Sequence, residues 1–200
     1  VMYKNSSTPL KESDLNENED IYDCYYGSGN TKLYLEKMCK FFSNFNKTKY
    51  TVLRQSNLYG PYDKYNLDNS HVLSATIVKV MSSKNIIRVW GNGKEKRDFL
   101  HVDDLMILLE NIIEMQYEQY HLVNTSFGLS ISISDLVSLI IEQSGKNLSI
   151  KYDENKPSIP INIHINNEKA KKLFNWRPNT DLRNGLKNTI DWYNENCISY

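Results

Sequence analysis

The sequence lacks the glycine-rich loop that holds the phosphates of a bound dinucleotide. Two Gly-x-Gly pieces are present, Gly27-Ser28-Gly29 and Gly91-Asn92-Gly93. Neither lies between a strand and a helix in the way that a dinucleotide fingerprint requires. Residues 1–200 therefore contain no recognisable phosphate loop.

The sequence also lacks an excess of charge, a cysteine framework and a long apolar run. Its 24 basic residues balance 24 acidic ones, which argues against general nucleic-acid binding, because that needs a basic face. Cys24, Cys39 and Cys197 have neither paired spacing nor a metal-ligand pattern, which predicts reduced thiols. No apolar run is long enough to span a bilayer, and no signal peptide is visible. We therefore expect a cytoplasmic protein that binds no nucleic acid, metal or membrane.

One stretch combines a strand end, a turn and a titratable side chain. The apolar run 50–54 predicts a buried strand, and Gly60-Pro61 turns the chain after it. Asn57 and Leu58 therefore lie at the carboxyl end of the strand, where open α/β sheets bind ligands. His71 precedes a helical run over 72–81 and is a candidate proton donor. A loop that simply holds a hydrogen-bonded histidine would give the same pattern.

Two helices are predicted on either side of this stretch. Residues 30–45 form an amphipathic pattern, whereas Gly27 and Gly29 disfavour a regular helix before it. Asp103 or Asp104 is predicted to cap a second helix. The apolar positions expected to face inward from the first helix are Leu33, Leu35, Met38, Phe41, Phe42 and Phe45.

Three motifs carry a resemblance to a known family. They are Asn57-Leu58-Tyr59-Gly60-Pro61-Tyr62-Asp63 with His71, then Val89-Trp90-Gly91-Asn92-Gly93, then Arg97-Asp98-Phe99-Leu100-His101-Val102-Asp103-Asp104. In these motifs the chain resembles the GDP-L-fucose synthases, nucleotide-sugar epimerases of the extended short-chain dehydrogenase/reductase group. The resemblance runs from Val1 to about Tyr193. It implies NADP or NAD as cofactor, a nucleotide sugar, most simply a GDP-hexose, as substrate, and a homodimer.

The resemblance also implies an α/β fold in two parts. One is the C-terminal part of a Rossmann-type parallel sheet domain, and the other is a smaller α/β lobe that binds the substrate. Residues 1–60 and 98–126 are expected in the first part, and residues 61–97 and 127–200 in the lobe. Because the chain begins at Val1 without a phosphate loop, a truncated N-terminus is expected, lacking the first half of the nucleotide-binding domain.

The same resemblance assigns catalytic roles and exposes two departures. Lys32 matches the lysine of a Tyr-x-x-x-Lys pair, which binds the nicotinamide ribose, but Ser28 stands where the tyrosine is expected. Val1 stands where a proton-moving cysteine is expected. Tyr26 would replace the phenol if the chain were looped before Lys32. Otherwise Tyr25 and Tyr26 are ordinary half-buried aromatics, and proton transfer is lost or moved elsewhere.

The remaining assignments concern cofactor and substrate binding. Asn57, Leu58 and His71 would meet the nicotinamide end, and His71 would also act as the acid in epimerisation. The substrate-binding positions matched by the family are Lys79, Trp90 and Arg97.

Three functions are compatible with these residues. The first is a nucleotide-sugar epimerase/reductase of the GDP-L-fucose synthase type. The second is a related 4-epimerase or 4,6-dehydratase. The third is a binding protein of the same fold that has lost catalysis.

Overall fold

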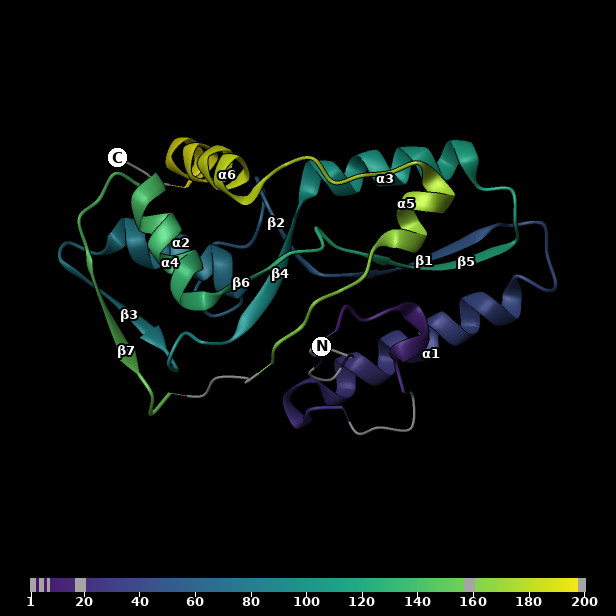
Figure 1. Cartoon of the computed structure of the whole chain (residues 1–200), viewed down its shortest axis with the longest axis horizontal. Coiled ribbons are helices and arrows are strands. Elements are labelled where there is room, and N and C mark those ends of the chain that lie inside the picture. Colours follow the sequence, from purple (N-terminus) through teal and green to yellow (C-terminus); the bar gives the residue numbers. More distant parts are fainter. Residues whose placement is uncertain (1–2, 4–5, 7, 17–20, 157–160, 198–200) are drawn as a thin grey trace.

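A computed structural model describes residues 3, 6, 8–16, 21–156 and 161–197 of the chain. The elements form two groups along the longest axis, with β3, β7, α2, α4 and α6 in one and β1, β5, α1, α3 and α5 in the other (Figure 1). Their bounds are η1 Glu12–Asp14, η2 Asp23–Tyr25, α1 Tyr26–Phe42, β1 Tyr50–Gln55, β2 Asn57–Tyr59, α2 Val72–Ser82, β3 Ile86–Trp90, β4 Lys96–His101, α3 Val102–Met115, β5 Tyr120–Thr125, β6 Ser130–Ser132, α4 Ile133–Gln143, β7 Ser149–Asp153, α5 Glu168–Phe174 and α6 Leu182–Asn196.

Parallel pairing dominates the described strands. β1 pairs with β5, β2 with β4, and β3 with β7, all in parallel, while β6 joins β4 antiparallel. Each parallel pair is separated in sequence by at least one helix, as parallel strands require. The predicted α/β class is confirmed.

β1 and β2 are almost one strand. Only Ser56 separates them, and its backbone N–H still donates to Thr125 O at the end of β5 (2.8 Å). β1 pairs in one group of elements, whereas β2 pairs with β4, which leads toward the other (Figure 1). The chain therefore crosses between the groups in extended conformation.

Each group has its own apolar core. Helices α2, α4 and α6 pack with β3 around Leu73, Ile77, Val80, Ile87, Val89, Leu136, Val137, Ile140, Leu186 and Ile190. Around β5, the helices α3 and α5 bury Leu100, Leu108, Ile112, Val123, Ala170, Phe174 and Trp176. α5 lies in the range assigned to the substrate lobe, yet it contacts α3 and β5. The lobe boundaries stay a prediction.

Helix α1 differs from its prediction at its first turn. It begins at Tyr26 and runs regularly through Gly27, Ser28 and Gly29. A Cβ atom at Gly29 would lie 2.7 Å from the Ile21 side chain, so glycine lets the preceding segment pack closely. Tertiary contact therefore outweighs the helix-breaking tendency of these glycines, and the expected loop is wrong.

The apolar face of α1 is also less buried than predicted. Phe41 and Phe42 at its end and Phe45 just after it are all exposed, and the Phe41 ring contacts the other two rings. Leu35 is exposed as well. The helix is amphipathic, but within the described residues nothing covers much of its apolar side.

The cap of α3 is a histidine. The Nδ1 atom of His101 accepts from Asp103 N (3.3 Å), so the predicted aspartate cap is wrong. Asp104 instead turns inward, where its carboxylate accepts from Asn179 N (2.9 Å) and Thr180 N (3.1 Å). A buried carboxylate needs such donors, and the chain segment before α6 supplies them.

Candidate active site

An ion pair sets how α1 faces β1. The guanidinium of Arg54 on β1 donates to both carboxylate oxygens of Glu36 on α1, at 2.7 Å from Nη2 to Oε2 and 3.0 Å from Nε to Oε1. Lys32 and Ser28 precede Glu36 by one and two helical turns, so they share its face. The helix runs antiparallel to β1, which places these earlier turns toward the carboxyl end of the strand (Figure 1).

Lys32 is available on this face. Its side chain is exposed and forms no hydrogen bond or ion pair in the described part of the chain. An unpaired ammonium near a strand end suits a hydroxyl or phosphate of a ligand. The position agrees with the predicted role in holding a ribose, which stays a prediction.

Neither Ser28 nor Tyr26 supplies a phenol beside Lys32. Ser28 uses its hydroxyl within the helix, donating to Tyr25 O (3.2 Å). Tyr26 is 62 % exposed, and on the regular helix it lies about 240° around the axis from Lys32. The predicted looped Tyr26 is therefore not observed.

Tyr25 is a phenol to which the sequence pattern gave no role in the site. It lies seven residues before Lys32, near the same face, but roughly 10 Å along the axis. Unlike Tyr26 it is half-buried, and its hydroxyl influences the Arg97 guanidinium electrostatically. A half-buried tyrosine before a helix on the lysine face is the signal that could have identified it.

The strand-end residues are held by β4. Asn57 donates from Nδ2 to Asp98 O (2.9 Å), which fixes its amide. The Asp98 carboxylate accepts from Phe127 N (2.9 Å) and Gly128 N (2.8 Å), while burial raises its pKa. Leu58 is half-buried, and its side chain packs against the core around α3 and α5.

His71 stands at the N-cap position of α2. Its side chain is exposed and does not cap the helix, although its carbonyl accepts from Ala75 N (2.8 Å). The imidazole has no partner in the part of the chain that the structure describes, so it is available to a ligand. Two turns later on the same helix stands Lys79.

Lys79 and Trp90 meet, as their shared assignment requires. The Lys79 ammonium lies 5.2 Å from the centroid of the indole at the end of β3, within cation–π range. Burial lowers the pKa of Lys79. A third residue that the sequence pattern missed, Lys156, lies 6.0 Å from the same centroid. A lysine in a loop gives no sequence signal of this kind.

Arg97 already forms hydrogen bonds within the protein. Its Nη1 atom donates to the carbonyls of Lys96 and Ile161. Burial lowers the pKa of Arg97, and the nearby groups of Glu95, Tyr25 and Tyr22 act in the opposite direction. The guanidinium therefore lies between β4 and the segment before α1.

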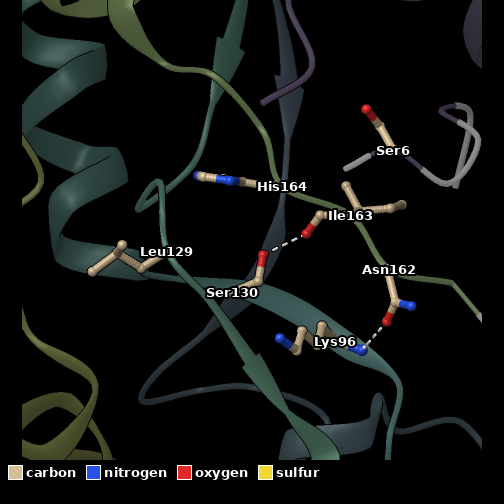
Figure 2. Close-up of a pocket in the computed structure, with 7 residues that line it drawn as sticks. All are labelled: Ser6, Lys96, Leu129, Ser130, Asn162, Ile163 and His164. Atoms are coloured by element: carbon tan, nitrogen blue, oxygen red, sulfur yellow. Dashed lines mark hydrogen bonds between the residues drawn. The ribbon is translucent and has the colours of Figure 1, made fainter. Parts of the chain in front are cut away.

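A hollow of about 630 Å³ opens beside β4 and β6 (Figure 2). It is lined by Ser6, Lys96, Leu129, Ser130, Asn162, Ile163 and His164. Lys96 and Arg97 alternate along β4, so the hollow and the Arg97 side chain lie on opposite faces of the strand. None of the predicted site residues lines this hollow.

The structure thus joins some of the predicted residues and not others. Lys79 contacts Trp90, and Asn57 is bonded to the strand that carries Arg97. Lys32 lies on α1 and His71 at the N-cap of α2, and neither side chain has a partner among the described residues. Parallel strand pairs connected through helices define the class, which is an α/β protein.

Comparison with known proteins gives the family. The model of the NAD dependent epimerase/dehydratase family matches residues 3–124, and the chain belongs to this family of NAD(P)-dependent enzymes. "Probable GDP-L-fucose synthase 1" of Oryza sativa subsp. japonica is 32 % identical over 168 residues, 82 % of this chain and 50 % of that protein. "GDP-L-fucose synthase 1" of Arabidopsis thaliana is 35 % identical over 149 residues, 72 % and 45 % of the two chains. The chain thus spans about half the length of these relatives.

Solved structures agree on the fold. The UDP-glucose 4-epimerase of Thermotoga maritima with UDP-glucose has a TM-score of 0.80 at 24 % identity, covering 98 % of this chain and 61 % of that one. MoeE5 in complex with UDP-glucose and NAD has a TM-score of 0.82 at 22 % identity, covering 98 % and 63 %. The Rossmann-type prediction is confirmed. In the described residues, no helix combines the length and apolar character needed to cross a membrane.

Proposed function

We propose that the chain belongs to an NAD(P)-dependent nucleotide-sugar epimerase/reductase of the GDP-L-fucose synthase type, acting in the cytoplasm on a GDP-4-keto-6-deoxyhexose. The observation that carries this proposal is the Lys79 ammonium over the exposed indole of Trp90 at 5.2 Å. A cation beside an open aromatic face suits an anionic ligand with a planar ring, and a nucleotide sugar is such a ligand. The relatives named for GDP-L-fucose favour the guanine nucleotide.

The cofactor would be NADP or NAD, and the residues present fit one end of it. Lys32 has no partner among the described residues, and its ammonium on α1 would hold the nicotinamide ribose. Asn57 and the backbone of Leu58 complete that edge. When bound, the nicotinamide supplies a hydride acceptor or donor at the sugar.

The chain's own residues would then bind and exchange protons. Lys79, Trp90 and Arg97 hold the nucleotide sugar, and His71 donates a proton during epimerisation. Ser28 contributes no acid in its present bond, and Tyr26 faces solvent. Val1, which stands at the position of the expected cysteine, lies outside the described residues. Two other phenols, Tyr25 and Tyr22, lie near Arg97.

We also propose a homodimer. The exposed rings of Phe41, Phe42 and Phe45 form an apolar surface at the C-terminal end of α1, and surfaces of this kind mark protein contacts. Sedimentation of the purified protein gives the mass directly. A monomer at all concentrations would reject this part.

The experiment for the main proposal is turnover. Purified protein receives NADPH and GDP-4-keto-6-deoxymannose, and absorbance at the nicotinamide band is followed. Oxidation of the cofactor with formation of a GDP-6-deoxyhexose supports the proposal. Absence of turnover with ligand binding intact rejects the enzyme.

Ligand binding without turnover would favour another function, that of a nucleotide-sugar-binding protein of the same fold that has lost catalysis. It is favoured by the bond between Ser28 Oγ and Tyr25 O, because this hydroxyl cannot replace a tyrosine. Calorimetry would then show nucleotide-sugar binding without chemistry. A related 4-epimerase or 4,6-dehydratase would be recognised by analysing products from UDP-sugars, since a similar fold occurs in a UDP-glucose 4-epimerase.

A further inference from the structure

The hollow beside β4 and β6 is built on one face of this antiparallel strand pair (Figure 2). Asp98 on β4 lies opposite Ser130 on β6. Lys96, two residues before Asp98, therefore shares the face of Ser130 as its diagonal neighbour. The Arg97 side chain alternates to the other face. The hollow has a volume of about 630 Å³, within the range of roughly 300 to 1,000 Å³ that is typical of small-molecule sites.

Hydrogen bonds hold the chain segment before α5 against this face. Lys96 N donates to Asn162 Oδ1 (3.0 Å), and Ser130 Oγ donates to Ile163 O. Ser6 N, from the segment before η1, donates to Asn162 O (3.4 Å). The walls of the hollow come from three parts of the chain, and bonds to the main chain join them.

Three polar groups that line the hollow have capacity for a ligand. The Lys96 side chain is exposed, and its ammonium has no partner in the described ranges. His164 Nε2 lies 2.7 Å from Gly128 O, and because a carbonyl only accepts, Nε2 carries the proton and Nδ1 is an acceptor. Ser130 Oγ donates its proton to Ile163 O and can still accept. One cation and two acceptors therefore line the same space.

This combination of groups fits a phosphorylated sugar. A phosphate suits the Lys96 ammonium, because the bond between them is charge-assisted. Sugar hydroxyls can donate to His164 Nδ1 and Ser130 Oγ, which a ligand without hydroxyl groups would leave unpaired. Leu129, which is 68 % exposed, and Ile163 add apolar surface for the C–H face of a sugar ring.

We propose that the hollow is a second ligand site, which binds a sugar phosphate. Lys96 holds the phosphate, and His164 and Ser130 accept from the hydroxyls. Arg97 donates to the carbonyl of Lys96, so this ligand and the substrate assigned to Arg97 would lie on opposite faces of one strand. The site goes beyond the proposed function and does not depend on it.

The test is titration of isotope-labelled protein with glucose 6-phosphate, fructose 6-phosphate and ribose 5-phosphate, followed by the NMR chemical shifts of backbone amides. Glucose and inorganic phosphate are titrated separately. At least one sugar phosphate should shift the amides of Leu129, Ser130 and His164. Its dissociation constant should be about tenfold or more below those of glucose and of phosphate, because only the sugar phosphate satisfies the cation and the acceptors together.

Variants locate the phosphate. In Lys96→Gln the affinity for the sugar phosphate should fall about tenfold, since a charge-assisted bond is lost. Lys187→Gln on α6 is the matched control, because Lys187 is an exposed lysine outside the hollow and its substitution removes the same charge. It should keep the affinity within about twofold. Leu129→Asp should also weaken binding, because it brings a like charge beside the phosphate.

Three results would overturn the inference. The first is the absence of shifts at these amides with all three sugar phosphates. The second is inorganic phosphate that binds as tightly as the best sugar phosphate, because this would show an anion site without sugar recognition. The third is an equal loss of affinity in Lys96→Gln and Lys187→Gln. None of these measurements involves NADPH or a nucleotide sugar, so failure here and failure of the proposed function are told apart.

Discussion

Arg54 on β1 and Glu36 on α1 form a nearly buried ion pair, with 2.7 Å between Nη2 and Oε2. The same guanidinium donates to Glu12 O (2.8 Å) and to the Tyr3 hydroxyl (3.3 Å). One side chain therefore ties α1, β1 and the segment before η2 together. This contact determines which way the face of α1 that carries Lys32 points.

Removing the carboxylate should destabilise the fold. Glu36→Ala leaves a buried guanidinium without its charge partner, which costs about 3 to 5 kcal/mol. The free energy of unfolding in urea measures this. The control is Glu110→Ala on the exposed side of α3, which should change it by less than about 0.5 kcal/mol. Equal losses in both variants would show that the pair is not held as described.

The Arg54–Glu36 ion pair fixes the orientation of the α1 face that carries Ser28 and Lys32. From this orientation we predict a gain of function. Ser28→Tyr places a phenol one turn from Lys32, whose charge favours the phenolate. Restoring a general acid is worth about 10² to 10⁴ in rate. Turnover of NADPH with the keto sugar should rise, while Tyr26→Phe should leave the rate unchanged because that ring faces solvent. No gain in Ser28→Tyr, with binding intact, would contradict this alignment of α1.

Gly185 on α6 is required by Tyr59. A Cβ atom at position 185 would lie 2.1 Å from the Tyr59 hydroxyl and 2.9 Å from its Cζ atom. Gly185→Ala should therefore cost about 1 to 3 kcal/mol of unfolding free energy. Gly27→Ala is the control, since no atom lies within 4 Å of its Cβ position, and it should stabilise by about 0.5 to 1 kcal/mol.

Tyr59→Phe tests the same contact from the other side. The buried Tyr59 hydroxyl has no hydrogen-bond partner among the described residues. Tyr59→Phe alone should cost little, and it should reduce the loss caused by Gly185→Ala. Strictly additive effects in the double variant would argue against the contact.

His101 predicts a pH dependence of stability. Burial lowers its pKa below the ordinary value of 6.5, although Asp103 and Asp104 act in the opposite direction. The unfolded chain then binds a proton more readily, so this group's contribution is present above about pH 6.5 and is lost as the pH falls toward the folded pKa.

The measurement compares unfolding free energies at pH 7.5 and pH 5 in wild type and His101→Asn. Asparagine can cap α3 but does not titrate. The variant should lose less stability over this interval. The pKa of His121 is also lowered by burial, but His121 is present in both proteins and cancels in the comparison. Identical losses would mean that His101 does not titrate differently on folding.

Lys146 should support the helix that carries Lys79. Its ammonium donates to the carbonyls of Val80, Met81 and Ser83 at the C-terminal end of α2. Lys146→Met removes these bonds and a favourable charge at the helix end, which should cost about 1 to 3 kcal/mol. Lys151→Met serves as control, and equal stability of the two variants would contradict the assignment.

Much of the fold follows from apolar periodicity and turn residues. The strands beginning at Tyr50 and Ile86 and the helix after His71 lie where the pattern predicts them. The start of α1 cannot be found this way, because Ile21 approaches Gly29 only through tertiary packing. The inward role of Asp104 escapes the pattern for the same reason, since its partners lie some 75 residues away in sequence.

The site residues also differ in whether the sequence predicts them or only tertiary packing brings them together. Lys79 and Trp90 are linked by family motifs, and their contact is observed. Lys156 lies near Trp90 only because β3 pairs with β7, and no local sequence pattern predicts that pairing. Tyr25 likewise depends on how the segment before α1 approaches β4.

The near-continuity of β1 and β2 limits how the protein can move. A backbone bonded to β5 before Ser56 and to β4 after it has no slack residues in which torsion angles could swing. Along this route, the strand pairing with β5 and with β4 fixes one group of elements against the other. Any movement of one group against the other along this route would therefore have to break strand pairing at β1 or at β2.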